Sequence, residues 1–577
     1  RCVSIEYLDF PVVEWTVYAK NVGEADSPIL EDLQALDWTL DRWAFPPAPG
    51  CEYTLHHFTG TPCTPQDYEP QVAELGPGAS KRIAAAGGRP TNTDLCYFNV
   101  EQPSSEGAII GLGWPGQWAA TFERDGATGL RVRAGQELLR TTLHPGEEIR
   151  SPLVALLFWQ GDWIRGQNLW RRWMVEHNLP RPGGKLPAPQ IAACSSHQFG
   201  EMINANEANQ KLFVDRYGEV GVKLDYWWMD AGWYPNVSGW PNTGTWEVDT
   251  TRFPNGLRAI GDHAHEQGVR IIVWFEPERV TPGTWLYEQH PEWLLGRDGD
   301  QKLLNLGHPD ARQWLTDHVD RVLTEQGIDL YRQDFNMDPL GFWRANDPED
   351  RQGITEIRHC EGYLAYWDEL RRRHPNMLID SCASGGRRND LETLRRSVPL
   401  LRSDWLLEPV SQQSHTYGIA FWYPFWGTGV NSSDPYYFRS VMCPHITGCY
   451  DVRRTDIDYA SVRNLVAQWR ETAPYLLLGD YYPLTTYSLA PDVWIGWQFD
   501  RPETGSGLVQ IFRRADSIYE KARLRLRGLD PAAAYGLRDL DRGEMGEMSG
   551  RELLDTGLPV EIPDRPGSLL LLYERSG

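Results

Sequence analysis

The chain has 577 residues and a formal net charge of −23, with 41% hydrophobic and 23% charged residues. This length predicts about two to four globular domains rather than one core. The acidic balance argues against nucleic acid or anionic membrane surfaces as partners, and no apolar run reaches the roughly 20 residues of a membrane span. Aromatic residues make up 12% of the chain, which is typical either of aromatic-rich cores and interfaces or of a sugar-binding site.

Residues 1–160 predict a β-sandwich. Apolar and polar residues alternate in the run SIEYLDFPVVEWTVYAKNVG (4–23), as in half-buried strands. Two further alternating runs flank Asp125-Gly126, which predicts a hairpin. Residues 161–187 begin with a helical pattern and end in the Pro- and Gly-rich run PRPGGKLPAPQ, so we interpret them as a helical linker.

Residues 188–478 predict a (β/α)8 TIM barrel, because strand-like runs alternate with amphipathic helical patterns. The expected strands lie in the runs 190–196, 223–233, 269–278, 301–307, 328–335, 376–386 and 398–405. Residues 479–577 show strand patterns and no helical ones, so they predict a C-terminal antiparallel β domain. The fold class expected is therefore a multidomain α/β protein with a central barrel.

Carboxylates stand at the carboxyl ends of several expected barrel strands, namely Asp230, Glu276 with Glu278, Asp334 and Asp404; Cys382 and Ser384 end a further strand. In this architecture the carboxyl ends of the strands form the catalytic face. A carboxylate at the end of an apolar strand is costly unless it is paired or takes part in chemistry. The structural alternative is that these acids only pair with neighbouring arginines, for which Arg279, Arg332, Arg387 and Arg402 are available.

The sequence predicts no metal ion and no cofactor. It has no H-E-x-x-H motif, no Asp-rich metal loop and no C-x-x-C pair, and Gly385-Gly386 lacks the lysine and spacing of a phosphate loop. The odd and sparse set of nine cysteines predicts mostly free thiols, with Cys51 and Cys63 as a candidate disulfide pair. Without a metal or cofactor site, the sequence favours carboxylate chemistry in an aromatic-rich pocket, which suits glycoside hydrolysis.

Five motifs occur in the order in which they are found in glycoside hydrolase family 36, the clan D family of α-galactosidases and α-N-acetylgalactosaminidase-like enzymes. They are WWMDAGW (227–233), VWFEPERV (273–280), YRQDF (331–335), SCASGGRRND (381–390) and LRSDW (401–405). The chain resembles this family over most of its length. The resemblance implies a β-sandwich, a catalytic barrel and a C-terminal β domain, with a retaining mechanism for terminal α-galactosyl-type residues.

The resemblance also implies site residues. Asp334 would be the nucleophile and Asp404 the general acid/base. The substrate-binding positions would be Asp230, Trp233, Trp274, Glu276, Arg332, Cys382, Gly385, Arg387 and Trp405. Because Arg332 lies two residues before Asp334, both side chains point to the same face of the strand, and the arginine is expected to keep Asp334 ionised. Asp404 must instead hold a proton at the working pH.

Three positions depart from the family pattern: Ala231 replaces an aspartate, Gly299 falls where a sugar-binding arginine is expected, and Trp405 follows the acid/base. These changes concern sugar recognition, so an α-N-acetylgalactosaminidase or α-galactosaminidase is an alternative. Further alternatives are a transglycosylase and a non-catalytic carbohydrate-binding protein. The expected partner is an oligosaccharide or glycoconjugate substrate, without nucleic acid or membrane. No signal peptide is visible, and secreted, periplasmic and cytoplasmic locations all stay open. The sequence also leaves open whether the protein forms a homo-oligomer and which glycosidic linkage it cleaves.

Overall fold

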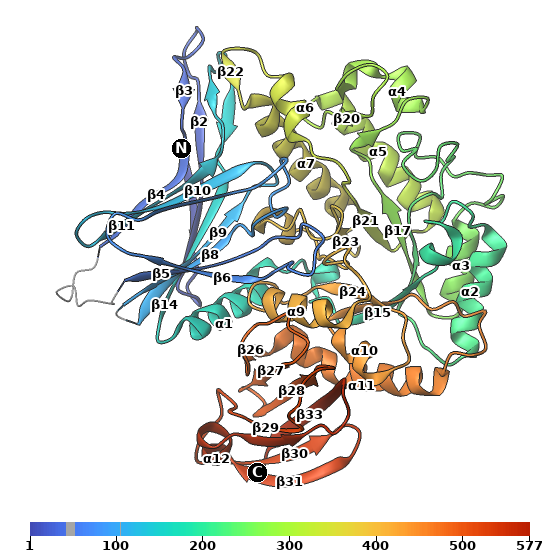
Figure 1. Cartoon of the computed structure of the whole chain (residues 1–577). Helices are drawn as coiled ribbons and strands as arrows, with labels where there is room; N and C mark the ends of the chain where they lie inside the picture. The colour runs from blue at the N-terminus through green and yellow to red at the C-terminus, as the bar shows by residue number, and fades with distance from the viewer. Residues whose placement is uncertain (42–51, 104, 577) are drawn as a thin grey trace.

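The computed structural model describes residues 1–41, 52–103 and 105–576. A β-sandwich lies beside a barrel of strands and helices, and a second β domain lies below both (Figure 1). The expected multidomain fold class is therefore confirmed. None of the helices within the described ranges has the length and apolar content that a membrane span requires.

The sandwich consists of two antiparallel sheets. The larger has the order β1 (Cys2–Glu6), β2 (Val12–Lys20), β14 (Leu153–Gln160), β9 (Glu106–Gly113), β8 (Tyr97–Gln102), β5 (Tyr53–Phe58) and β6 (Pro70–Leu75), with β13 (Glu148–Arg150) also pairing with β2. The smaller has the order β4 (Gln34–Asp41), β11 (Gly129–Gln136), β10 (Trp118–Arg124) and β7 (Ser80–Ala84). Burial alternates along β10, as the two-residue period of a half-buried strand requires. The hairpin predicted at Asp125-Gly126 is confirmed by β10 and β11.

Helix α1 (Trp163–Trp173) joins the sandwich to the rest of the chain. The Asp162 side chain caps it by accepting a hydrogen bond from the Arg165 amide at 2.8 Å. Trp170 packs so closely on β9 that a Cβ on Gly111 would lie 2.5 Å from its ring. Arg171 donates to the carbonyls of Ala420 and Tyr423 at 2.7 and 2.9 Å. This helix therefore contacts both the sandwich and the barrel.

The barrel is a parallel sheet with the order β23 (Leu378–Ser381), β21 (Leu330–Gln333), β17 (Arg270–Phe275), β16 (Tyr226–Met229), β15 (Gln190–Cys194), β25 (His445–Gly448) and β24 (Gly427–Val430). Residues 398–402 close the gap between its two ends. Val398 bridges in parallel to Asp380 of β23, and the Arg402 amide donates to the Gly427 carbonyl of β24 at 2.9 Å. This irregular segment takes the place of the remaining barrel strand, so the expectation of a regular strand at 398–405 is wrong: only isolated bridges form there.

Two further strand assignments in the barrel need correction. The run 301–307 is not a barrel strand: β20 (Lys302–Leu304) pairs antiparallel with β18 (Arg279–Val280) and β19 (Leu294–Leu295) in a small separate sheet. The sequence reasoning also missed β24 and β25. A short run carries no signal for its pairing partner, and the glycines within GTGV and HITG weaken the strand pattern despite the β-branched residues beside them.

Helices cover the outside of the barrel, as in other (β/α)8 folds. They are α2 (Glu207–Glu219), α3 (Arg258–Glu266), α4 (Trp285–Gln289), α5 (Pro309–Gln326), α6 (Leu340–Ala345), α7 (Ile354–Arg373), α8 (Leu391–Leu394), α9 (Pro409–Ile419), α10 (Pro435–Ser440) and α11 (Tyr459–Leu478). Because every strand runs parallel to its neighbours, all strand ends and the loops that follow them gather on one face of the barrel.

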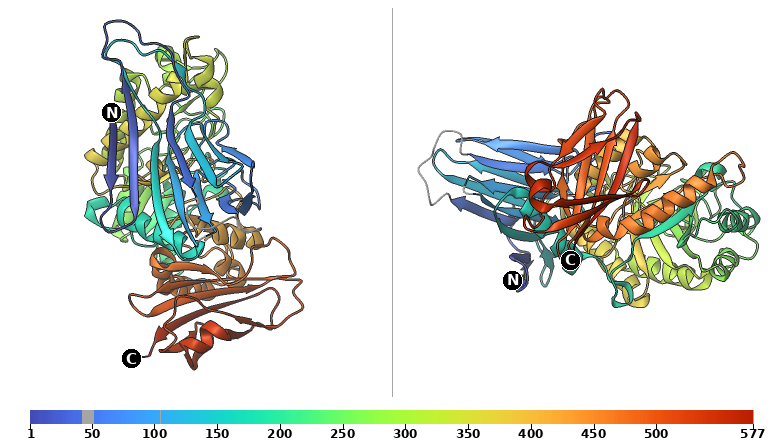
Figure 2. Two further views of the ribbon diagram at one scale, coloured as in Figure 1. Left: turned by 90° about the vertical axis from the view of Figure 1, so that its left-hand side faces the viewer. Right: turned by 90° about the horizontal axis from the view of Figure 1, so that it is seen from below.

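The C-terminal domain is an antiparallel sheet with the order β26 (Asp480–Pro483), β27 (Trp494–Arg501), β28 (Ser506–Arg513), β33 (Gly567–Arg575), β30 (Ala534–Asp539) and β31 (Gly543–Ser549). The pair β29 (Lys521–Leu524) and β32 (Leu558–Glu561) lies beside it, and Figure 2 shows this domain as a separate layer. The expectation that this region has no helix is wrong: α12 (Gly550–Asp555) forms, with Ser549 as its N-cap.

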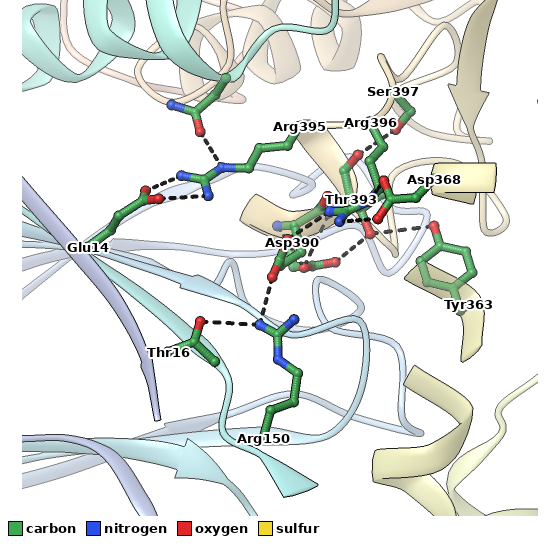
Figure 3. Close-up of polar contacts among 12 residues, drawn as sticks. Glu14, Thr16, Arg150, Tyr363, Asp368, Asp390, Thr393, Arg395, Arg396 and Ser397 are labelled. Carbon is green, nitrogen blue, oxygen red and sulfur yellow. Dashed lines mark hydrogen bonds and ion pairs between the residues drawn. The ribbon is translucent and has the colours of Figure 1, made fainter. Parts of the chain in front are cut away.

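Charged residues join the sandwich to the barrel at α8 (Figure 3). Arg395 forms a two-pronged ion pair with Glu14 of β2, and Arg150 of the sandwich donates to Glu392 at 2.7 Å. Arg396 pairs with Asp368 of α7 at 2.8 Å. The pairs with Glu14 and Arg150 hold the sandwich on the barrel, and the pair with Asp368 fixes the end of α8 against α7 within the barrel.

Candidate active site

A pocket of about 350 Å³ opens at the carboxyl ends of the barrel strands. That volume is in the range typical of small-molecule sites. The lining residues are Cys194, Ser196, His197, Glu201, Trp228, Asp230, Ala231, Trp240, Trp274, Arg332, Asp334, Asn336, Leu401, Asp404, Leu406, Gly429, Thr447 and Cys449. They combine indole rings with a few charged side chains, an arrangement that suits a ligand with both apolar faces and hydroxyl groups.

Asp334 lies directly after β21 and is 7% exposed. Its carboxylate accepts hydrogen bonds from the amides of Phe335 and Ser384, at 2.7 and 3.0 Å, and from the Trp274 indole at 3.1 Å. Burial alone would raise the pKa of Asp334, but the Arg332 charge and these donors outweigh it, so the pKa lies below the ordinary carboxyl value. Asp334 is thus an ionised, oriented carboxylate.

Arg332 supplies this positive charge from the same strand. Its guanidinium lies 4.2 Å from the ring centroid of Trp228 and forms an ion pair with Asp380 of β23. Both partners are almost fully buried. The Arg332 charge lowers the pKa of Asp334, in the expected direction, although the direct ion-pair partner of Arg332 is Asp380. The role of Arg332 in substrate binding stays a prediction.

Asp404 faces the same pocket from the segment that follows residues 398–402. The loss of bulk water around this carboxyl group and the nearby charge of Asp334 raise the pKa of Asp404 to about 7. The Asp404 side chain remains accessible to solvent through the pocket. A bound sugar that displaces the solvent there would therefore raise the pKa of Asp404 further. The preceding Ser403 hydroxyl donates to Asp67 of the sandwich, which fixes the backbone at Asp404.

Asp230 is a third carboxylate in the pocket, at the end of β16. Burial raises the pKa of Asp230 to about 6, against the lowering effect of Arg332. Glu201 lies close enough to add to this increase, and it accepts a hydrogen bond from the Ser196 hydroxyl at 2.6 Å. The pocket is therefore rich in negative charge.

The remaining predicted residues divide into those that line the pocket and those that support it. Trp274 lines it. Trp233 is fully buried behind it and donates its indole N–H to the Trp274 carbonyl at 2.8 Å. Glu276 is also fully buried, where it pairs with Arg279 and accepts from the amide of the pocket residue Asn336. Trp233 and Glu276 therefore act through their neighbours.

Four other predicted residues lie outside the pocket lining. The Cys382 thiol is buried and accepts from the Gly385 amide at 3.3 Å. Gly385 packs against Ser403 and Asp404. Arg387 donates to the carbonyls of Thr61 and Pro62 in the sandwich. Trp405 is 39% exposed and donates to the Ser411 hydroxyl.

Several pocket residues were not found from the sequence. Gly429, Thr447 and Cys449 lie on β24 or β25 or directly after them, the strands that were not recognised. Cys194 ends β15, so its strand-end position was an available signal. Cys63 is a free thiol, whereas Cys51 lies outside the described residues. Within the described ranges, His, Cys, Asp and Glu side chains do not form a group able to hold a metal ion.

The comparisons with known proteins agree on one family. A family model described as Melibiase matches residues 201–435. Alpha-galactosidase 1 of Pediococcus pentosaceus is 26% identical over 358 residues, covering 57% of this chain and 47% of the relative. The probable alpha-galactosidase C of Aspergillus terreus is 26% identical, over 84% of this chain and 67% of its own length. The chain thus spans about half the length of the first relative and about two thirds of the second.

Solved structures share the fold. The GH36 α-galactosidase AgaA of Geobacillus stearothermophilus superposes with a TM-score of 0.85 at 20% identity, covering 99% of this chain and 80% of that one. The α-galactosidase of Lactobacillus brevis superposes with a TM-score of 0.86 at 18% identity, over 98% and 78%. At these identities the superposition establishes the fold, and the chemistry has to be argued from the pocket.

Proposed function

We propose that the chain is a member of the α-galactosidase-like glycoside hydrolases of family 36, which its similarity to the Melibiase model and to α-galactosidases supports. We propose further that it is a retaining exo-acting α-glycosidase that hydrolyses terminal α-galactosyl residues. One observation carries the proposal: two aspartates in one pocket have pKa values shifted in opposite directions. The pKa of Asp334 lies below its ordinary value, and that of Asp404 is about 7. A nucleophile must be ionised and a general acid must be protonated, so a retaining mechanism needs two carboxyl groups with different pKa values.

The proposed reaction has two displacements. In the first, an Asp334 carboxylate oxygen attacks C1 of the sugar while the C1–O bond breaks and Asp404 gives its proton to the leaving oxygen. In the second, ionised Asp404 takes a proton from water, the water oxygen bonds to C1, and Asp334 is released. Two inversions at C1 retain the α configuration.

We assign substrate binding to the polar and aromatic groups of the pocket. Asp230 would accept hydrogen bonds from sugar hydroxyls, and the indoles of Trp228, Trp240 and Trp274 offer apolar surface for the C–H faces of the ring. Trp405, exposed beside Asp404, would contact the leaving group. Oligosaccharides such as the raffinose and stachyose bound in AgaA structures are the first substrates to test.

A second candidate is an α-galactosaminidase with the same mechanism. Besides the general acid Asp404, the pocket is lined by the carboxylates of Glu201, Asp230 and Asp334, while its arginine, Arg332, already pairs with Asp380. Uncompensated negative charge favours a cationic 2-amino sugar over a neutral one. An N-acetylated sugar lacks this cation, so the charge argument does not extend to it.

A panel of nitrophenyl α-glycosides tests the proposal. We expect the highest kcat/KM on α-galactoside; a higher value on α-galactosaminide would favour the second candidate. Asp334→Asn should lower kcat by ~10³-fold or more, because an amide cannot form the glycosyl-enzyme. Activity of this variant within tenfold of wild type contradicts the nucleophile assignment.

The same panel separates the remaining alternatives. An excess of acceptor sugar that diverts most product into new glycosides would indicate a transglycosylase. A folded protein that binds sugar but turns over no member of the panel would indicate a carbohydrate-binding protein.

A further inference from the structure

Arg89 of the sandwich reaches into the barrel face beside the pocket. It is 5% exposed, and its guanidinium pairs with Asp338 at 2.7 Å. One nitrogen, Nη1, faces three acceptors: the carbonyls of Phe335 and Ala383, both at 3.3 Å, and the Ser384 hydroxyl at 3.2 Å. These acceptors belong to two loops, one after β21 and one after β23.

Both loops hold Asp334. Phe335 follows it directly, and the Ser384 amide donates to its carboxylate at 3.0 Å. Ser384 has a φ of 54°, a left-handed conformation that costs a non-glycine residue energy and persists only where its surroundings enforce it. The Ser384 hydroxyl also donates to Asn336 of the pocket at 2.7 Å. Arg89 is therefore one contact away from the carboxylate proposed as nucleophile.

We propose that Arg89 is a positioning residue, by which the N-terminal sandwich holds the nucleophile Asp334 in its reactive orientation. The proposal rests on the function assigned above. Arg89 joins the two loops, and this keeps Ser384 in its left-handed conformation with its amide directed at Asp334. Only an arginine offers a planar set of donors that serves a carboxylate, two carbonyls and a hydroxyl together. The sandwich is thus a part of the active site, although none of its described residues lines the pocket.

Arg89→Gln tests the proposal, with Arg124→Gln as the matched control. Arg124 is a buried sandwich arginine that also donates to backbone carbonyls, those of Ala127 and Gly129, but it contacts no barrel residue in those bonds. We expect both variants to lower Tm. Arg89→Gln should lower kcat by about 10- to 100-fold with KM within about threefold, because a misplaced nucleophile mainly affects the chemical step. Arg124→Gln should keep the wild-type kcat.

A second readout separates positioning from stability. A mechanism-based 2-deoxy-2-fluoroglycosyl fluoride esterifies the nucleophile with loss of fluoride, and peptide mass spectrometry identifies the labelled residue. We expect labelling of Asp334 in wild type and in Arg124→Gln at equal rates, and labelling at least tenfold slower in Arg89→Gln.

Equal labelling rates in all three proteins would overturn the proposal while leaving the nucleophile assignment intact. A label on another residue in wild type would overturn both. If Arg89→Gln does not fold, Arg89→Lys keeps the charge opposite Asp338 but cannot reach all the acceptors. It should show an intermediate loss of kcat, and an unchanged kcat in that variant would contradict the proposal.

Discussion

Identical side chains acquire different acidities in this pocket. Asp334 lies between an arginine and three hydrogen-bond donors, so its pKa is lowered. The surroundings of Asp404 desolvate its carboxyl group, the negative charge of Asp334 lies nearby, and none of the described residues donates a hydrogen bond to it, so its pKa rises to about 7. Environment rather than residue type therefore assigns the two roles.

The pH dependence of kcat/KM follows from these shifts. A general acid must be protonated, so activity should fall as pH rises through about 7, where Asp404 ionises. A nucleophile must be ionised, so activity should also fall at acid pH, but only below the ordinary range of an aspartate. An aryl glycoside that needs no acid should lose the alkaline decline of its first step. If kcat/KM of Asp404→Ala still falls at alkaline pH, a group other than Asp404 causes that fall.

Chemical rescue tests the role of Asp404 directly. Asp404→Ala should impair substrates with poor leaving groups most, since these need protonation. Activated aryl glycosides should form the intermediate and then stall, and added azide, which needs no base, should restore turnover as an α-glycosyl azide. A β-glycosyl azide would mean that the two carboxylates are assigned the wrong way round. If Asp404→Ala loses the same activity on substrates with all leaving groups, and azide does not restore it, Asp404 has a purely structural role.

At the scale of elements, the loop after β23 packs against the segment that carries Asp404. Gly385 has a φ of 82°, and a Cβ there would lie 2.7 Å from the Ser403 Cα and 2.9 Å from the Asp404 amide nitrogen. A side chain at this position must therefore push the acid/base segment away. The glycine serves both the backbone conformation and the close approach.

Gly385→Ala should lower activity by about 10- to 100-fold by displacing Asp404, and should destabilise the fold by about 1–3 kcal/mol. Gly283→Ala is the matched control, because Gly283 has the same φ of 82° and nothing within 4 Å of its added Cβ. The control should lose stability without losing activity. Chemical denaturation and kcat/KM measure the two effects, and equal activities in both variants would contradict the displacement.

At the scale of the whole molecule, buried ion pairs join the sandwich to the barrel (Figure 3). Burial opposes the ionisation of Glu392, but Arg150, Arg396 and Arg395 outweigh it and lower its pKa from 4.5 to about 2. A carboxylate with a lowered folded-state pKa stabilises the fold above its unfolded pKa. That stability should be lost as pH falls from about 4.5 towards 2.

Glu392→Gln should therefore lower the free energy of unfolding at pH 7 by about 3 kcal/mol, as expected for removing one partner of a buried ion pair. Its stability should also depend less on pH between about 4.5 and 2. Glu123→Gln is the control, because the Glu123 pair with Arg133 is partly exposed and is expected to be worth at most about 1 kcal/mol. Identical pH curves for wild type and Glu392→Gln would exclude this role.

Sequence patterns alone predicted the class of each region and the strand ends that carry Asp230 and Asp334, whereas Asp404 follows an irregular segment and not the expected strand. These features are local, since alternation, helical period and a carboxylate after an apolar run can be recognised within about ten residues. The family motifs added the roles of nucleophile and acid/base. Neither source of information required knowledge of which segments touch.

Contacts between distant segments were decided only by the tertiary structure. The run 301–307 pairs outside the barrel, and β24 and β25 pair within it, because pairing depends on partners that lie far away in the chain. Arg89 meets Ser384 across 295 residues, a contact that no local pattern encodes. The opposite pKa shifts of Asp334 and Asp404 likewise depend on how the folded chain places charges and excludes water around two chemically identical groups.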